Sequence, residues 1–306
     1  MSAQLESRAS FQATIAHGFW KQAFTSVPPI PLNVNLAGKV ILVTGSNVGL
    51  GLESVRQFLK LRPSRVIMAV RSLEKGETAA AFLRVEFPGT GIQVWEIDMA
   101  SFQSVQAFAA RLERDLNCGR LHVAVLNAGL SKLKFERAEE GARRESTIQV
   151  NYLATALLTL MLLPLMRPTA SSPEPGRLSI VNSDAALPAE LEDPAEGGLL
   201  DSLDRAETYD GFSQYSKSKL LVMIFVAKLA ELVSPDEVII NCTDPGATKG
   251  TAFFREIDSW AFKMVLGILM GIMGRNMTEA ARIYLYSTLV LGKESHGSYT
   301  DWIVRA

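Results

Sequence analysis

The 306-residue chain has few residues of the types that build disulfide frameworks or metal sites. It contains two cysteines, Cys118 and Cys242, and three histidines. Two lone thiols in a chain of this size indicate a reduced intracellular protein, and not a disulfide framework. The histidines, His17, His122 and His296, have no cysteine or acidic partner at ligand spacing, so we expect no metal site.

The chain also lacks an excess of charge and a long apolar run. Its formal net charge is −1, so we expect no nucleic-acid partner. The longest apolar runs, Leu153–Met166 and Trp260–Met273, have about 14 residues each, whereas a bilayer span needs about 20. The first residues lack the basic and then apolar order of a secretory signal. We expect a cytoplasmic protein with no integral membrane span, and Trp260–Met273 leaves peripheral membrane association open.

From Lys39 onward, strand-like and helix-like segments alternate. Apolar runs with β-branched residues occur at Val40–Val43, Val66–Val70, Ile92–Ile97, Leu121–Leu126, Leu178–Val181 and Val238–Ile240. Helical spacing occurs between them, at Leu50–Leu61, Leu73–Phe87, Ser101–Leu116, Glu145–Met166 and Ser213–Leu232. This alternation predicts a doubly wound α/β fold, with a mostly parallel sheet covered by helices on both faces.

The proline-rich segment Val27–Pro31 separates two predicted regions. Residues 1–36 form an N-terminal extension, and residues 37–306 form one domain. Within the domain, Asp184–Phe212 carries nine acidic residues and one arginine. It is either a solvated loop or an insertion that covers a substrate.

The first predicted strand runs into a glycine-rich loop. Its spacing is Gly-x-x-x-Gly-x-Gly, and not the commoner Gly-x-Gly-x-x-Gly. Glycines let backbone N–H groups approach a pyrophosphate at the positive start of a helix. Its place after the first strand therefore predicts a dinucleotide site. The predicted ligands are Gly45, Ser46, Asn47, Val48, Gly49, Leu50 and Gly51.

Basic residues follow the second predicted strand. Arg71 comes directly after it, Lys75 lies one helical turn further on, and no acidic residue occurs from Val66 to Leu73. An acid there would bind the ribose of NAD, whereas arginine pairs with the 2′-phosphate of NADP. We therefore predict NADP(H) as the cofactor.

The third and fourth predicted strands end in further candidate cofactor residues. Asp98, with Met99 beside it, closes the third strand, where its carboxylate can accept from the adenine amino group. The fourth strand ends in Asn127, Ala128 and Gly129. Small residues there let a cofactor lie across the sheet edge.

Tyr215 and Lys219 lie four positions apart in a predicted helix, so they share one face. A free phenol has a pKa of about 10, and a nearby ammonium lowers it. Such a tyrosine can donate a proton to a carbonyl oxygen as hydride arrives at the carbon. Ser183 ends the fifth strand and offers a hydroxyl to the developing oxyanion. Each pattern alone is common by chance.

The order of these motifs resembles the short-chain dehydrogenase/reductase family over about residues 37–305. The matching motifs are Thr44–Gly51, Asp98, Asn127-Ala128-Gly129, Asn151, Ser183, Tyr215-x-x-x-Lys219 and Pro245-Gly246. The resemblance implies a Rossmann fold with seven strands, Tyr215 as catalytic acid/base, and Lys219 as a ribose ligand that lowers the Tyr215 pKa. It also implies that Ser183 orients the substrate and that Asn151 takes part in a water-linked proton relay.

The sequence departs from the family's pattern twice near the fifth predicted strand and the insertion that follows it. Tyr215 follows Ser183 by 32 positions, whereas about a dozen is usual in the family, so Asp184–Phe212 is an insertion on the substrate side. Asn182 stands where a second serine is common.

A third departure follows Pro245-Gly246, where the family binds the nicotinamide. The usual hydroxyl position is occupied by Gly250, with Thr248 and Thr251 on either side. We predict that Pro245, Gly246 and Thr248 contact the cofactor.

Residues of about 250–276 occupy the position of the family's substrate lid. Methionines and aromatics there favour an adaptable apolar cover, with a plain core helix as the alternative. They are Trp260, Phe262, Met264, Met270 and Met273. Residues 70–77, Ser183-Asp184 and Ser295–Tyr299 look like fungal members of secondary-metabolite pathways, and also like retinol-type dehydrogenases.

Together these features predict an NADPH-dependent carbonyl reductase for a bulky apolar ketone or aldehyde. The alternatives are NADP-dependent alcohol oxidation by the same residues, a catalytically silent nucleotide-binding scaffold, and epimerase or dehydratase chemistry, for which the chain leaves little room. Helices Glu145–Met166 and Ser213–Leu232 resemble the pair through which family members dimerise, so a homodimer is expected by analogy.

Overall fold

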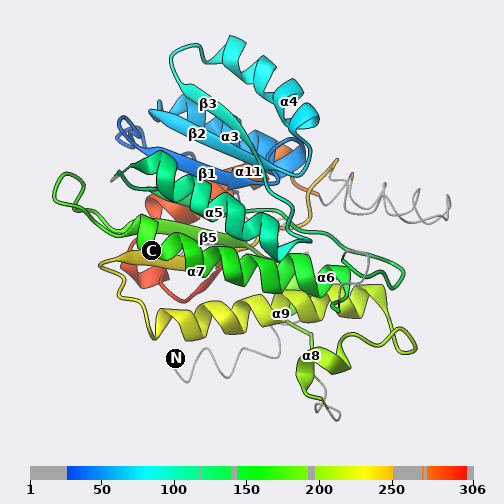
Figure 1. The fold of residues 1–306 in the computed structure, drawn as a ribbon. Helices are drawn as coiled ribbons and strands as arrows, with labels where there is room; N and C mark the ends of the chain where they lie inside the picture. Colours follow the sequence, from blue (N-terminus) through cyan, green and yellow to red (C-terminus); the bar gives the residue numbers. More distant parts are fainter. Residues whose placement is uncertain are drawn as a thin grey trace.

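A computed structural model of the chain shows one parallel sheet between two layers of helices (Figure 1). The structure describes residues 26–117, 119–138, 143–191, 197–250, 271 and 274–301. The sheet has seven strands in the order β3-β2-β1-β4-β5-β6-β7, and each pairs with its neighbours in parallel. Their bounds are β1 Val40–Thr44, β2 Arg65–Val70, β3 Gly91–Glu96, β4 Val123–Leu126, β5 Gly176–Val181, β6 Val238–Thr243 and β7 Tyr299–Thr300. The doubly wound Rossmann fold is confirmed.

Helices cover both faces of the sheet because the strands are apolar on both faces. The helices α5 (Phe102–Leu116), α7 (Thr155–Met166) and α9 (Gly211–Ala230) lie on one face and share a core with the inner strands. The helices α3 (Gly49–Lys60), α4 (Leu73–Glu86) and α11 (Met277–Leu285) pack against the other face. Each fully buried aliphatic side chain contributes about 1.5–3 kcal/mol, so these two cores hold the strand ends in place.

Short polar side chains begin four of these helices, and one of them, Asn276, begins α11 by accepting the Glu279 N–H at 2.7 Å. The hydroxyls of Ser72 and Ser101 accept backbone N–H groups at the starts of α4 and α5. The carboxylate of Asp210 accepts the Ser213 N–H at 2.7 Å and begins α9. Such caps satisfy N–H groups that have no partner within the helix. The cap on α9 matters most for function, since Tyr215 lies in its second turn.

The six strands predicted from apolar runs are confirmed, β7 is the seventh strand that the resemblance implies, and α11 is an addition. β7 has two residues, Tyr299 and Thr300, which is too short for a periodic pattern. The predicted helix Glu145–Met166 is present but is not uniform. It consists of α6 (Ser146–Ile148), a π-helical stretch η1 (Gln149–Ala154) and α7. π-helical turns often occur at functional sites, and this one carries Asn151.

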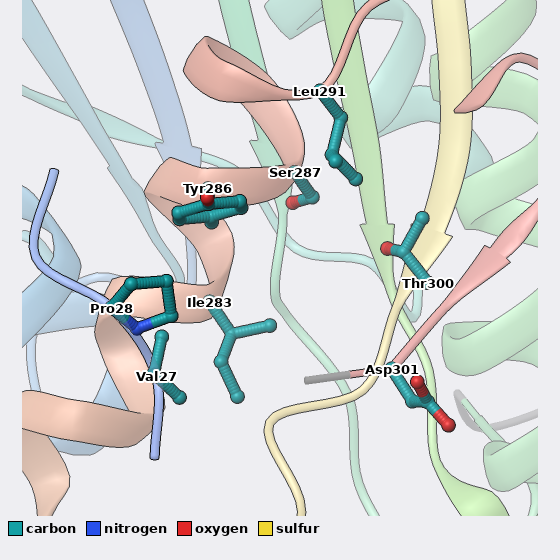
Figure 2. A pocket seen from close by; sticks show the side chains of 8 residues that line it. All are labelled: Val27, Pro28, Ile283, Tyr286, Ser287, Leu291, Thr300 and Asp301. Carbon is teal, nitrogen blue, oxygen red and sulfur yellow. The ribbon is translucent and has the colours of Figure 1, made fainter. Parts of the chain in front are cut away.

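Val27, in the described part of the predicted N-terminal extension, packs against α11. The Val27 N–H donates to Glu279 Oε1 at 3.1 Å, and Arg282 donates to the Val27 carbonyl at 2.8 Å. Figure 2 shows the small pocket that this contact leaves, lined by Val27, Pro28, Ile283, Tyr286, Ser287, Leu291, Thr300 and Asp301. Its volume of about 10 Å³ holds roughly one water, so it is no site for a dinucleotide.

Within the described part of the chain, one helical segment, Ser146–Met166, is long and apolar enough to cross a membrane. Half of that segment is buried inside the protein. The buried side chains Leu158, Leu162 and Met166 belong to the core shared with α5. Burial of this kind is what the core helix of a folded domain shows. The apolar segment Trp260–Met273 lies outside the described residues, apart from Gly271.

Candidate active site

The predicted site residues gather at the carboxyl edge of the sheet, where the chain changes direction. From β1 the chain winds outward to β2 and β3, then returns to place β4 on the other side of β1. Loops after such neighbouring strands diverge and leave a crevice for a ligand. The loops after β1 and β4 carry the predicted glycines and Asn127.

The loop after β1 is tight enough to require glycine. Gly45 and Gly49 have φ values of +63° and +59°, in the left-handed region. A Cβ on Gly51 would lie 2.4 Å from the Gly45 carbonyl oxygen and 2.6 Å from Asn127 Nδ2. The glycine-rich loop and the end of β4 therefore approach too closely for a side chain at position 51.

Ser46 in this loop is fully buried, and its Oγ has no hydrogen-bond partner among the described residues. A buried hydroxyl of this kind calls for a ligand or a water. The backbone of the half-buried glycine-rich loop, the start of α3 and the Ser46 hydroxyl together suit a pyrophosphate. The residues present therefore fit a dinucleotide.

Asn127 joins the two loops. Its Nδ2 donates to the carbonyls of Thr44 at 3.0 Å and Gly45 at 3.2 Å, and its Oδ1 accepts from the Tyr284 hydroxyl at 3.1 Å. Ala128 N–H donates to Thr44 Oγ1 at 3.0 Å. Sequence reasoning missed Tyr284, because it lies on α11, 157 positions from Asn127.

Arg71 and Lys75 lie on the surface at the end of β2 and in the first turn of α4. Neither side chain makes a hydrogen bond or an ion pair with another residue in the described ranges. Asp98, after β3, accepts the Ala100 N–H at 2.9 Å through Oδ1, and the neighbouring Met99 is buried. The basic pair Arg71 and Lys75, and the pair Asp98 and Met99, all lie at the sheet edge where the sequence predicts them.

Tyr215, Ser183 and Lys219 come together at the ends of β5 and α9. The Ser183 hydroxyl lies close enough to the Tyr215 phenol to act on its pKa. The Lys219 Nζ lies 5.7 Å from the centre of the Tyr215 ring and donates to the Val181 carbonyl at 2.8 Å. Tyr215 and Lys219 expose only 8% and 6% of their surface. A phenol, a hydroxyl and an ammonium thus share one buried corner.

Burial has the largest effect on the pKa values of Tyr215 and Lys219. It raises the pKa of Tyr215, although the Ser183 hydroxyl acts in the opposite direction and the Asp244 and Asp184 carboxylates raise it further. Burial also lowers the pKa of Lys219 to about 8. The net pKa of Tyr215 therefore lies above that of a free phenol, because desolvation of the phenolate outweighs the Ser183 hydroxyl, and the lowering effect of Lys219 stays a prediction.

Asn151 reaches this corner indirectly. Its Oδ1 accepts the Leu130 N–H at 2.9 Å, and its Nδ2 donates to the Leu130 carbonyl at 2.8 Å and to Ser218 Oγ at 3.0 Å. It therefore ties the loop after β4 to α9. A Cβ on Gly129 would lie 3.2 Å from Asn151 Oδ1 and 3.7 Å from Lys219 Nζ, which accounts for glycine there.

The loop after β6 carries Pro245 and Gly246. Gly246 has a φ of +71°, and Thr248 Oγ1 donates to its carbonyl at 3.0 Å. Asp244, which sequence reasoning missed, is 4% exposed. It accepts the Gly246 N–H and the Tyr299 hydroxyl, both at 2.9 Å. Burial and the Asp184 charge raise the Asp244 pKa to about 7.

Comparisons with known proteins agree with this geometry. The sequence model of the family described as short chain dehydrogenase matches residues 39–192. Short chain dehydrogenase virL of Hypocrea virens is 44% identical over 311 aligned residues, which cover 100% of this chain and 88% of virL. Short chain dehydrogenase opdN of Penicillium oxalicum is 43% identical, with 97% of each chain covered. The chain belongs to the short-chain dehydrogenase family.

Solved short-chain dehydrogenases share the fold. A short chain dehydrogenase of Escherichia coli CFT073, complexed with NADPH, has a TM-score of 0.65 at 22% identity and covers 90% of this chain and 100% of its own. One from Shigella flexneri, complexed with NADP, also has a TM-score of 0.65, at 21% identity, and covers 88% and 99%. As a short-chain dehydrogenase, the chain is an oxidoreductase, and nicotinamide dinucleotides are the family's cofactors.

Proposed function

We propose that this short-chain dehydrogenase is an NADPH-dependent carbonyl reductase for a bulky apolar ketone or aldehyde. The observation that carries the proposal is the buried contact of the Tyr215 hydroxyl with Ser183, with the Lys219 ammonium beside the phenol ring. Donors held in a water-poor corner stabilise developing charge more strongly than donors in water.

In the proposed reaction, Ser183 holds the carbonyl oxygen and Tyr215 donates its proton to that oxygen. The Lys219 ammonium favours the phenolate that remains. Asn151 holds the loop after β4 in register with α9. When bound, NADPH would supply the hydride. The residues that would hold it are 45–51, Arg71, Lys75, Asp98, Met99, 127–129, Tyr215, Lys219, Pro245, Gly246 and Thr248.

The choice of NADPH over NADH rests on Arg71 and Lys75. Both are exposed where a 2′-phosphate would lie in this fold, with no acid between Val66 and Leu73. The two solved relatives that carry NADPH or NADP support the same choice. Alcohol oxidation by the same residues is the second candidate, because proton and hydride transfer are reversible. The intact Ser183, Tyr215 and Lys219 disfavour a silent scaffold.

The substrate class is tested with a panel of carbonyl compounds and NADPH consumption as the readout. Bicyclic and aromatic ketones should turn over with a higher kcat/KM than acetone or acetoin, since the predicted lid of about residues 250–276 is rich in methionine and aromatics. Faster turnover of a small polar ketone than of every bulky one would contradict this part of the proposal.

A cytoplasmic homodimer completes the proposal. Leu160 on α7 and Ile224 on α9 are 49% and 44% exposed, and the two helices lie on the same face of the sheet (Figure 1). Apolar side chains exposed on adjacent helices are suited to an interface between copies.

The fungal relatives and the three stretches resembling secondary-metabolite enzymes support a role in a secondary-metabolite pathway.

A further inference from the structure

Glu145 is a fully buried carboxylate at the start of α6. Its Oε1 accepts the Thr147 N–H and hydroxyl, both at 2.8 Å, and the Tyr209 hydroxyl oxygen lies 3.3 Å away. Its Oε2 accepts the Ile148 N–H at 3.1 Å and Gln214 Nε2 at 3.0 Å. Four donors from two separate segments, the start of α6 and α9, therefore converge on one side chain.

The Glu145 carboxylate is stabilised by dipoles. Among the residues that the structure describes, no lysine or arginine lies within 4 Å of it. The helix start and the neutral donors hold the negative charge. A buried anion of this kind is costly unless every partner stays in place, so the arrangement of its donors is fixed.

Gln214 connects this carboxylate to the catalytic helix. It directly precedes Tyr215, is 6% exposed, and its Nε2 donates both to Glu145 and to the Leu203 carbonyl at 2.8 Å. On the other side, Glu145 begins the helix that carries Asn151. One hydrogen bond thus joins the Asn151 helix to the residue next to the proton donor.

The insertion Asp184–Phe212 is held by the same network. Arg144 pairs with Asp201 at 2.7 Å and also with Asp204. The Glu145 N–H donates to Asp204 Oδ1 at 2.7 Å, and the Tyr209 hydroxyl donates to the Lys132 carbonyl at 2.9 Å. These bonds hold the described part of the insertion against the residues that begin α6 and against the loop after β4.

We infer that Glu145, through Gln214, is a positioning residue that sets Tyr215 against Ser183 and Asn151, with the insertion as its clamp. This inference rests on the proposed function, because it assigns Glu145 a part in placing the proton donor. Glu145 touches neither Tyr215 nor Ser183, so its effect passes through α9. An error of about 1 Å in such a placement costs as much as a hundredfold in rate.

The test is Gln214→Leu in the full-length chain. This change removes the bridge but leaves the bonds of Glu145 to Thr147 and Ile148, so the start of α6 keeps its cap. The matched control is Gln57→Leu, since Gln57 is also buried and donates to a backbone carbonyl, that of Thr278, at 2.7 Å on the other face of the sheet. Each variant is measured for kcat, KM, the pH profile of kcat, the NADPH Kd by fluorescence, and Tm.

Gln214→Leu should lower kcat by about tenfold or more, shift the pH profile, and leave the NADPH Kd within about twofold. Gln57→Leu should lower Tm by a similar amount while keeping kcat and the pH profile. An unchanged kcat in Gln214→Leu, or an equal loss in Gln57→Leu, would overturn the positioning role. If Tyr215→Phe also retains turnover, the proposed function itself fails; if Tyr215→Phe is inactive and Gln214→Leu is normal, only the positioning role fails.

Discussion

At the residue scale, we expect the positive charge of Arg71 at the end of β2 to select the dinucleotide. Arg71→Ala should raise the KM for NADPH by at least about tenfold and leave the KM for NADH nearly unchanged, since one charge-assisted contact with a phosphate is worth about 1.5–3 kcal/mol. Steady-state kinetics with both cofactors measures the ratio. An equal change for the two cofactors would show that Arg71 does not bind the 2′-phosphate.

The residues that sequence reasoning found are those whose position in an element is local. Tyr215 and Lys219 share a helix face, and Ser183 follows the end of β5 by two residues, so spacing alone predicts where they lie. Tyr284, Asp244 and the Glu145–Gln214 pair depend on contacts between residues far apart in the chain, such as the 69 positions between Glu145 and Gln214. Such contacts have no sequence pattern. The rise of the Tyr215 pKa likewise comes from burial by residues far away in the chain, which spacing does not predict.

At the scale of elements, α7 and α9 carry the exposed apolar face proposed for dimerisation. The double change Leu160→Glu and Ile224→Glu places charges there and should convert a dimer, of about twice the 33.4 kDa chain mass, into a monomer, as measured by sedimentation. Val85→Glu is the control, because Val85 is 84% exposed on α4, which packs on the other face. A wild-type monomer, or a dimer that survives the double change, would contradict this interface.

The insertion shows what periodicity cannot predict about an element. The acidic composition of Asp184–Phe212 suggested a solvated loop or a substrate cover. In the structure, Asp201 and Asp204 pair with Arg144, 57 and 60 positions away, and the role of the insertion as a substrate cover stays a prediction. Composition indicates that such acids face water or a cation, but not which cation. By contrast, helix boundaries at Ser72, Ser101 and Asp210 follow from local capping and agree closely with the sequence.

At the scale of the whole molecule, His122 should make stability depend on pH. Its Nδ1 accepts the Val40 N–H at 3.0 Å, and burial, followed by the charges of Lys39 and Arg120, lowers its pKa to about 4. A folded pKa below the unfolded value of about 6.5 means that the fold prefers the neutral ring. Its contribution to stability is complete above about pH 6.5 and is lost as the pH falls toward 4.

The free energy of unfolding in urea, measured at about pH 7 and pH 5, tests this dependence. The wild type should lose more stability between the two values than His122→Asn does, because the variant has no imidazole to protonate. Parallel losses in the two proteins would mean that other groups carry the pH dependence.

The central claim is that Tyr215 donates the proton in a reaction of bound NADPH. Tyr215→Phe removes one oxygen from a residue that is 8% exposed. The variant should lose at least about a hundredfold in kcat with the best ketone of the panel, and its NADPH Kd from fluorescence should stay within about twofold. Tyr286→Phe, outside the site, should keep both values. Turnover of Tyr215→Phe at close to the wild-type rate would contradict the account.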